Sequence, residues 1–173
     1  LMPRNVHISV IKICAMQNIL PIFFDLEFSP ETGHYKPISK MWLENVFKKI
    51  DFNEKKIVGV ILVSPTYHGY AGDLEPLIDL CHQKNLPVLV DEAHGSYFLF
   101  CENLNLPKSA LISNADLVVH SLHKSLNGLT QTAALWYKGN LINEQNLINS
   151  INLLQTTSPS SLLLSSCEES IKD

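Results

Sequence analysis

The chain has 173 residues, of which 46% are hydrophobic and 17% charged, and its formal net charge is −4. This length suits one globular domain with a substantial core. The high hydrophobic fraction and the slightly negative net charge exclude a disordered tail and a basic nucleic-acid surface. No apolar run approaches the ~20 residues that a membrane-spanning helix needs. We therefore expect a single folded domain with neither nucleic acid nor membrane as partner.

Four cysteines, Cys14, Cys81, Cys101 and Cys167, are scattered along the chain without a C-x-x-C pair or a histidine at zinc-ligand spacing. We predict no metal site and assign no role to these thiols, because free cysteine usually behaves as a small hydrophobic residue. Their pattern is typical of a protein of the reducing cytoplasm.

Apolar residues recur at helical spacing in some segments and form continuous β-branched runs in others. In chain order we expect a helix at 4–17, a strand at 19–27, a turn-rich link, a helix at 39–50, a strand at 56–66, a helix at 72–85, a strand at 86–93, a short helix at 108–115, strands at 116–121 and 130–138, and helices at about 141–154 and 160–171. Ser39 and Asp73 are the candidate N-caps of two of these helices. The alternation predicts an α/β fold of three layers, α/β/α, with a mostly parallel sheet, in one domain over residues 1–173.

Polar residues follow two of the buried strands at the point where each strand ends. Asp91 ends one strand, while Ser121, His123 and Lys124 come directly after the other. In open sheets of this kind, ligands bind outside the carboxyl ends of the strands. We therefore expect both groups to face one crevice.

The string Asp-Glu-Ala-His at 91–94 also occurs in nucleotide-driven helicases, where acids hold magnesium. Such a motor needs a phosphate loop of the form G-x-x-x-x-G-K-[ST], and the 173 residues contain none. The helicase interpretation is therefore disfavoured, and the acid must serve another purpose.

Lys124 is the candidate nucleophile, because it stands alone among small polar residues directly after a strand. A lysine that forms an imine must lose its proton, which desolvation and nearby cations favour. Pyridoxal phosphate needs such a lysine on its aldehyde carbon and an anion beside its pyridine nitrogen. Asp91 would supply the anion. A lone lysine in this place is more often a surface residue, so the pairing with Asp91 carries the hypothesis.

The stretches "VDEAHGSYF" and "HSLHKSLNGLTQTA", with "PRNVHISV" upstream and "TTSPSSLLLSS" downstream, resemble the major domain of the bacterial-type ornithine/lysine/arginine decarboxylases. The resemblance extends over nearly the whole chain. It implies the aspartate-aminotransferase fold (fold type I) and dependence on pyridoxal phosphate.

The resemblance also implies roles for individual residues. Lys124 would form the imine with the cofactor, Asp91 would pair with the pyridine nitrogen, and His7 would stack on the cofactor ring. His94 would lie near the phenolic oxygen of the ring and, like Lys124, is a candidate to protonate the substrate. For each histidine the alternative is a structural one, in which the ring caps a helix or satisfies a buried hydrogen bond.

Three further residues complete the expected cofactor site. Ser121 and His123 would approach the phosphate, and Thr156 would reach the cofactor of a neighbouring subunit. The alternative for Thr156, as for Ser158, is that it caps the last helix.

The chain departs from the family pattern in two respects. Ile8 stands where the family typically has a lysine after the motif histidine. The segment that holds the phosphate should precede residue 1, and a C-terminal domain that completes the substrate pocket also lies outside the 173 residues. We therefore expect a partial major domain that binds the cofactor weakly by itself, since helix N-termini supply much of such phosphate binding.

The function implied is decarboxylation of lysine, arginine or ornithine, small-molecule substrates, to a polyamine precursor. The enzyme would be a cytoplasmic homodimer or a larger homo-oligomer. One alternative is an aminotransferase or an α-oxoamine synthase of the same fold, although Arg4 is the only arginine available to clamp a substrate carboxylate. The other is a truncated, non-catalytic domain.

Overall fold

The computed structural model describes residues 1–100 and 104–172. Its helices are α1 (Ile8–Met16), α2 (Lys40–Lys48), α3 (Glu75–His82), the 3-10 turn η1 (Ser96–Leu99), α4 (Leu122–Ser125), α5 (Glu144–Leu154) and α6 (Ser161–Lys172). Its strands are β1 (Met2–Pro3), β2 (Phe23–Phe24), β3 (Phe28–Ser29), β4 (His34–Tyr35), β5 (Val60–Val63), β6 (Val88–Asp91), β7 (Leu117–His120) and β8 (Ala134–Tyr137).

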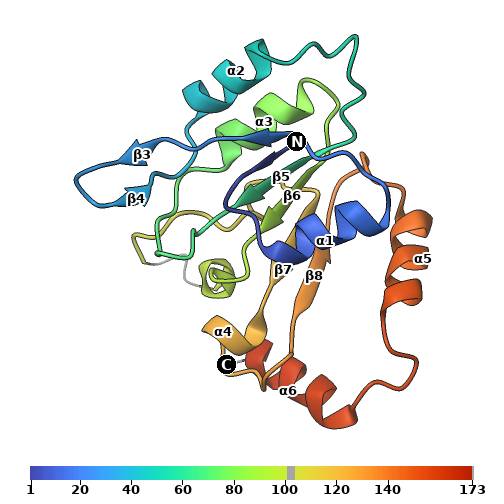
Figure 1. Cartoon of the computed structure of the whole chain (residues 1–173). Helices are drawn as coiled ribbons and strands as arrows, with labels where there is room; N and C mark the ends of the chain where they lie inside the picture. The colour runs from blue at the N-terminus through green and yellow to red at the C-terminus, as the bar shows by residue number, and fades with distance from the viewer. Residues whose placement is uncertain (101–103, 173) are drawn as a thin grey trace.

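A four-stranded sheet with the order β5-β6-β7-β8 forms the centre of the fold (Figure 1). The pairs β5–β6 and β6–β7 are parallel, and β8 is antiparallel to β7. The short parallel pair β1–β2 extends this arrangement, because the Leu1 carbonyl accepts a hydrogen bond from the Ile61 N–H at 2.9 Å. The α/β fold with a mostly parallel sheet is thereby confirmed.

One face of the sheet forms the main core under α2 and α3. Leu62, Val90 and Val118 point to this face and are fully buried, together with Leu77 and Ile78 of α3. Full burial of such side chains contributes about 1.5–3 kcal/mol each. Because side chains alternate along a strand, the neighbouring residues must point to the other face.

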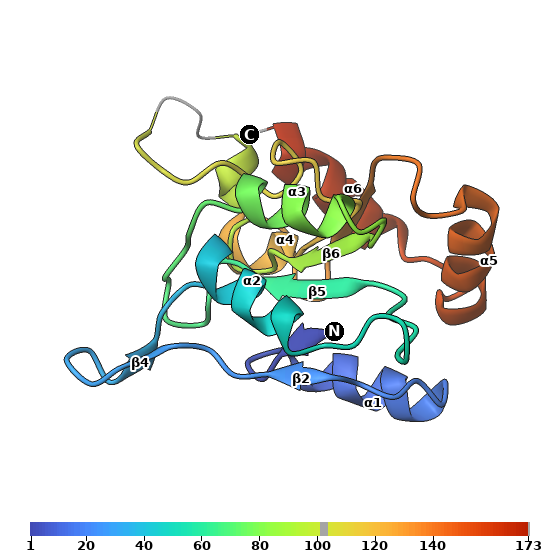
Figure 2. The ribbon, with the colours of Figure 1, turned by 90° about the horizontal axis from the view of Figure 1, so that it is seen from above.

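Helix α1 lies on that other face, so that α3 and α1 are on opposite sides of β5 and β6 in Figure 2. A smaller cluster forms there from Val6 and Cys14, against which Val10, Ile61 and Val63 pack. Helices on both faces of the sheet give the three predicted layers.

The structure corrects several predicted boundaries. The first helix begins at Ile8 rather than at residue 4, because Met2 and Pro3 pair with β2. The expected strand at 19–27 is reduced to Phe23–Phe24 for the same reason, since β1 offers only two residues as partners.

The short helix predicted at 108–115 is wrong. Residues 110–114 form turns, and Asn114 adopts a left-handed conformation with φ 66° that ends any helical run. In the turn-rich link, β3 and β4 form an antiparallel hairpin closed around Gly33, whose φ is 70°.

One predicted helix cap is confirmed and one is shifted. The Ser39 Oγ accepts a hydrogen bond from the Trp42 N–H at 3.2 Å and caps α2. The N-cap of α3 is Leu74, one position later than the predicted Asp73, yet the Asp73 carboxylate still accepts a hydrogen bond from the Glu75 N–H at 3.2 Å.

Helix α5 lies beside the β8 edge of the sheet, and α6 lies below the sheet near α4 (Figure 1). A hydrogen bond from the Leu129 N–H to the Ser166 Oγ, at 2.8 Å, connects α6 to the loop after α4. Among the described residues, no helix combines the length and apolarity needed to cross a membrane.

Cys14 and Cys81 are buried free thiols, and Cys101 lies outside the described residues. Burial raises the pKa of the Cys81 thiol to about 12, with a further contribution from the negative charge of Asp116.

Candidate active site

The carboxyl ends of the parallel strands bring the candidate residues into one cavity. In the strand register, Asp91 of β6 lies between Val63 of β5 and Val119 of β7. A cavity of about 540 Å³ opens above these three residues. It is lined by Asn5, Val6, His7, Ile8, Ser9, Val63, Pro65, Tyr67, Asp91, Ala93, His94, Val119, Ser121 and Lys124.

Asp91 offers its carboxylate to this cavity because it is the last residue of β6 and points to the α1 side of the sheet. One carboxylate oxygen, Oδ1, accepts a hydrogen bond from the Ala93 N–H at 3.2 Å. No other hydrogen bond to this side chain is formed within the described residues. The second oxygen thus remains available to a donor in the cavity.

Lys124 enters the cavity from α4, the single turn that begins directly after β7 with Ser121 as N-cap. Its Nζ lies 3.4 Å from the His94 Nε2, and the side chain is otherwise exposed. The amine therefore has the His94 ring on one side and open space on the other, where it can be reached by a ligand in the cavity.

His94 is held between Lys124 and an aromatic ring. The ring of Tyr67 meets that of His94 edge to face, with 5.7 Å between centroids. Desolvation lowers the pKa of the imidazole from its ordinary value of 6.5, and the positive charges of Lys124 and His7 act in the same direction, while Asp91 acts against them. The neutral ring is favoured as a result, and its unprotonated nitrogen can accept a hydrogen bond.

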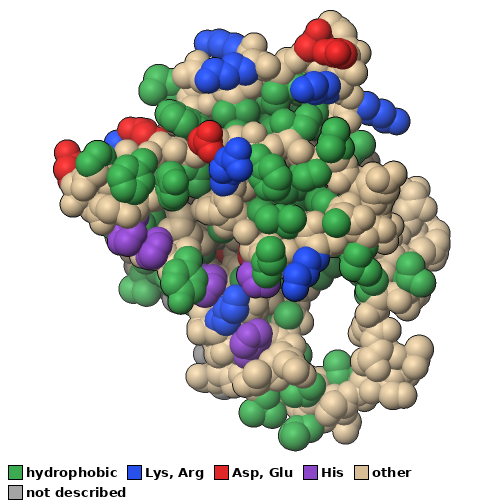
Figure 3. Space-filling model, viewed as in Figure 1, with side chains coloured by type: hydrophobic (Ala, Val, Ile, Leu, Met, Phe, Trp, Pro, Cys, Tyr) green, Lys and Arg blue, Asp and Glu red, His purple; other side chains and the backbone are tan. Residues whose placement is uncertain are grey.

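His7 caps α1 and lines the cavity at the same time. Its Nδ1 accepts a hydrogen bond from the Ser9 N–H at 3.3 Å and lies 2.8 Å from the Ser9 Oγ. The capping role that the sequence left open is thus confirmed. Figure 3 shows histidine side chains gathered on this face of the molecule beside a basic side chain.

Two predicted residues do not line the cavity. The His123 Nδ1 donates a hydrogen bond to the Thr132 carbonyl at 2.8 Å, which ties its ring to the following loop. Thr156 lies between α5 and α6, where its Oγ1 accepts the Ser158 N–H at 3.2 Å. This contact is a local turn, and the role of Thr156 in a neighbouring subunit stays a prediction.

Sequence reasoning missed Asn5 and Tyr67, which also line the cavity. The Asn5 Oδ1 is buried without a hydrogen-bond partner among the described residues. Tyr67 could have been predicted from the rule that ligands bind at the carboxyl ends of parallel strands, because it follows the end of β5 by four residues. Sequence reasoning also did not predict that Glu92, His120 and Trp136 form a buried network next to the site.

A larger groove of about 780 Å³ lies elsewhere, lined by Phe23, Trp42 and Val46 among others. Its acid, Asp25, is already paired with Arg4 at 2.7 Å. The groove thus lacks the combination seen in the smaller cavity, an acid without an ion-pair partner next to an amine at neighbouring strand ends. We therefore consider the smaller cavity the candidate active site.

Residues 1–172 match the family model described as "Orn/Lys/Arg decarboxylase, major domain". The chain belongs to this family. Arginine decarboxylases of Bacillus cereus and Bacillus subtilis are 38% and 35% identical to it, each over 168 residues, or 97% of the chain. The chain spans about a third of the length of these curated relatives, namely 35% and 33%.

Solved structures share the fold at low sequence identity. A PLP-bound putative aminotransferase from Clostridium difficile 630 superposes with a TM-score of 0.71 at 16% identity, over 99% of this chain and 44% of its own. Mouse CSAD gives a TM-score of 0.66 at 21% identity, over 95% of this chain and 34% of its own. These likenesses confirm the predicted fold class, and the helicase interpretation is wrong because the matched family is a decarboxylase domain.

Proposed function

We propose that this chain forms the cofactor-holding part of a pyridoxal-phosphate-dependent decarboxylase of basic amino acids. The observation that carries the proposal is that an acid from β6 and an amine from the turn after β7 line the same cavity. Family membership supports the reaction type. Each group would perform one task that this cofactor needs.

The residues present fit the cofactor. Asp91 has a carboxylate oxygen free of partners within the described residues, suited to hold a protonated pyridine nitrogen by a charge-assisted hydrogen bond. Lys124 presents its amine to open space, where it would bind the aldehyde carbon. The cavity of about 540 Å³ is within the usual range for small-ligand sites.

When bound, pyridoxal phosphate supplies an electron-poor ring that takes up the electron pair released as carbon dioxide leaves. The protein must keep the ring nitrogen protonated, exclude water and move protons. Asp91 performs the first task by its negative charge. His7 would cover the ring from the α1 side, and Ser121 would donate a hydrogen bond to the phosphate.

His94 and Lys124 would carry out the proton transfer that the reaction requires. Because desolvation lowers the pKa of His94 and favours its neutral ring, the His94 Nε2 would accept a hydrogen bond from the Lys124 amine 3.4 Å away and orient that amine. The same pair can return a proton to the substrate carbon after the carboxylate leaves. His123 and Thr156 would act outside the cavity, His123 by fixing the loop that follows Lys124 and Thr156 at a neighbouring subunit.

We propose arginine as the substrate and agmatine as the product, because relatives at 35–38% identity are named arginine decarboxylases. The aminotransferase alternative lacks support from the described residues: Arg4, the chain's only arginine, pairs with Asp25 and does not line the cavity. A carboxylate clamp from this chain is thus missing.

A homo-oligomer in the cytoplasm is part of the same proposal. Leu153 is 80% exposed and Leu162 is 67% exposed, on α5 and α6 respectively, which is costly for a monomer. Light scattering on the protein and on a Leu153→Glu, Leu162→Glu variant checks it: the mass should fall in the variant.

The function is tested in a chimera in which residues 1–172 replace the matching part of the Bacillus cereus relative. We expect agmatine from arginine in the chimera and none after Lys124→Ala. A folded chimera that binds the cofactor but converts arginine, lysine and ornithine to no amine contradicts the proposal.

A further inference from the structure

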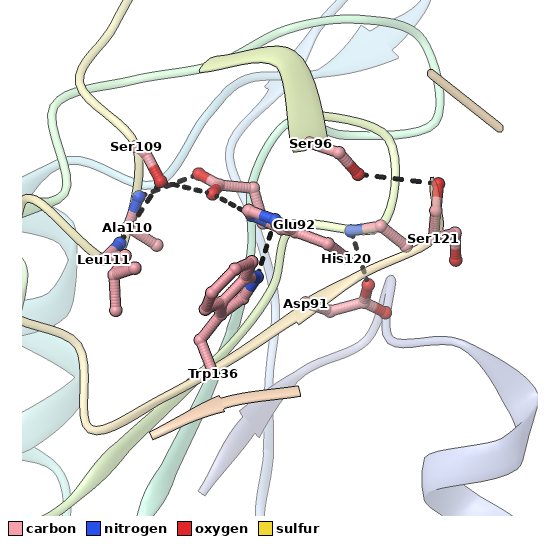
Figure 4. A network of polar contacts seen from close by, with 10 residues as sticks. Asp91, Glu92, Ser96, Ser109, Ala110, Leu111, His120, Ser121 and Trp136 are labelled. Carbon is pink, nitrogen blue, oxygen red and sulfur yellow. Dashed lines mark hydrogen bonds and ion pairs between the residues drawn. The ribbon is translucent and has the colours of Figure 1, made fainter. Parts of the chain in front are cut away.

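Glu92 and His120 are both 0% exposed and directly adjoin the two strand ends that form the cavity. Glu92 follows Asp91, and His120 precedes Ser121. Figure 4 shows them close to Asp91 and Ser121 and joined into one network with Trp136 and Ser109. They form a polar network on the core side of the sheet, opposite to Asp91.

The Glu92 carboxylate accepts three hydrogen bonds. Its Oε1 accepts the Ala110 N–H at 2.8 Å, and its Oε2 accepts the Ser109 hydroxyl at 2.7 Å and the His120 Nε2 at 2.8 Å. Such a fully satisfied buried network holds its members in one arrangement. Three separate segments of the chain, those of Glu92, of Ser109 and Ala110, and of His120, thereby meet at one carboxylate.

Trp136 determines which ring nitrogen of His120 carries the hydrogen. The indole N–H of Trp136, which can only donate, lies 2.9 Å from the His120 Nδ1. The Nδ1 must therefore accept, and the Nε2 carries the hydrogen that is donated to Glu92. Trp136 of β8 therefore donates to His120 of β7, which donates to Glu92 directly after β6. Only one placement of the hydrogens satisfies both hydrogen bonds.

We propose that Glu92, His120 and Trp136 are positioning residues that set the spacing between Asp91 and Lys124. The inference rests on the proposed function, in which these two residues hold one cofactor. Glu92 is the covalent neighbour of Asp91, and His120 begins the four-residue path to Lys124. Any displacement of the two buried side chains is therefore transmitted to opposite sides of the cavity.

A second network on the same strands provides a matched control. At the other ends of β6 and β7, the Asp116 Oδ2 accepts hydrogen bonds from the Val88 N–H at 2.7 Å and from the His82 Nε2 at 2.8 Å. Asp116 is 2% exposed. Its removal should destabilise the same sheet without moving the cavity.

Glu92→Gln is the sharpest substitution because it preserves volume and removes one acceptor. If the new amide faces His120, the histidine must carry its hydrogen on Nδ1, which then opposes the Trp136 N–H. If the amide is flipped, it opposes the Ala110 N–H. In both orientations of the amide, two hydrogen-bond donors face each other. Adding Trp136→Phe removes the indole N–H and so relieves the conflict only in the first orientation.

The experiment compares Glu92→Gln, Glu92→Gln with Trp136→Phe, and Asp116→Ala. Borohydride trapping of pyridoxal phosphate on Lys124 should require roughly tenfold more cofactor in Glu92→Gln, the ratio that about 1.4 kcal/mol produces. The Trp136→Phe background should recover part of this loss. Asp116→Ala should remain within about twofold of the unmodified chain.

A second readout needs no cofactor. The pKa of His94, followed by NMR titration, reports the nearness of Lys124, Asp91 and His7. We expect it to shift in Glu92→Gln and not in Asp116→Ala. An unchanged His94 titration in folded Glu92→Gln, or equal trapping losses in Glu92→Gln and Asp116→Ala, overturns the inference. Absence of trapping in the unmodified chain would instead count against the proposed function, while the His94 titration would still decide the inference.

Discussion

Gly95 directly follows the Asp-Glu-Ala-His motif and packs against Pro65 of the loop that carries Tyr67, and Gly95→Ala tests how closely these two segments meet. A Cβ at position 95 would lie 2.6 Å from the Pro65 Cδ, and 3.0 Å from both the Glu92 Cγ and the Phe98 Cδ2. The closest of these distances falls about 0.8 Å short of the 3.4 Å at which ordinary contacts begin. Overpacking of this kind costs about 1–3 kcal/mol.

The loss of glycine also has a stabilising effect, which partly offsets this steric cost. The φ of Gly95 is −120°, which alanine adopts without strain, so the substitution also restricts the unfolded chain and stabilises by about 0.4–1 kcal/mol. The steric cost is larger, and we expect the free energy of unfolding to fall by about 1–2 kcal/mol. The melting temperature should decrease by about 2–4 °C for each kcal/mol.

Thermal and urea unfolding measure the effect, with Gly59→Ala as the matched control. The nearest atoms to a Cβ at position 59 are the Pro87 carbonyl oxygen at 3.2 Å and the Pro87 Cγ at 3.5 Å. The control should therefore change stability by less than about 1 kcal/mol. The reasoning is refuted if Gly95→Ala is as stable as Gly59→Ala or more stable than the unmodified chain.

Four further outcomes are expected. Lys124→Ala should raise the pKa of His94 toward 6.5 and Asp91→Asn should lower it further in NMR titrations, because the first change removes a positive and the second a negative charge. Because folding lowers the pKa of His94, its contribution to stability should be complete above about pH 6.5 and decline as the pH falls through that value, as urea unfolding at several pH values would show. The Cys81 thiol should resist a maleimide at neutral pH until the chain is unfolded, since burial raises its pKa to about 12. Ser39→Ala should lower the free energy of unfolding by about 1 kcal/mol and Ser39→Thr by less, because only alanine removes the cap of α2.

The sequence was sufficient to predict which residues share the candidate cavity, because ligands of open parallel sheets bind at the carboxyl ends of the strands. Asp91, Ser121 and Lys124 each lie at or just after the end of a parallel strand, and the structure brings all three to one cavity. His123 follows the same strand end but turns toward the Thr132 carbonyl, a choice made by the returning loop and invisible in the local sequence.

Features that depend on distant partners could not be predicted. The residues at 108–115 have helical composition, yet the Ala110 N–H and the Ser109 hydroxyl bind Glu92 and the segment forms turns. Glu92 itself was part of a recognised motif, but its burial against His120 follows only from the pairing of β6 with β7.

The most direct test of the account is to add pyridoxal phosphate, reduce with borohydride and identify the modified lysine by mass spectrometry. We expect modification at Lys124, a sharp decrease in its yield after Asp91→Asn, and no compensating modification elsewhere after Lys124→Ala. Modification spread evenly over exposed lysines such as Lys36 and Lys108, with no preference for Lys124, would contradict it.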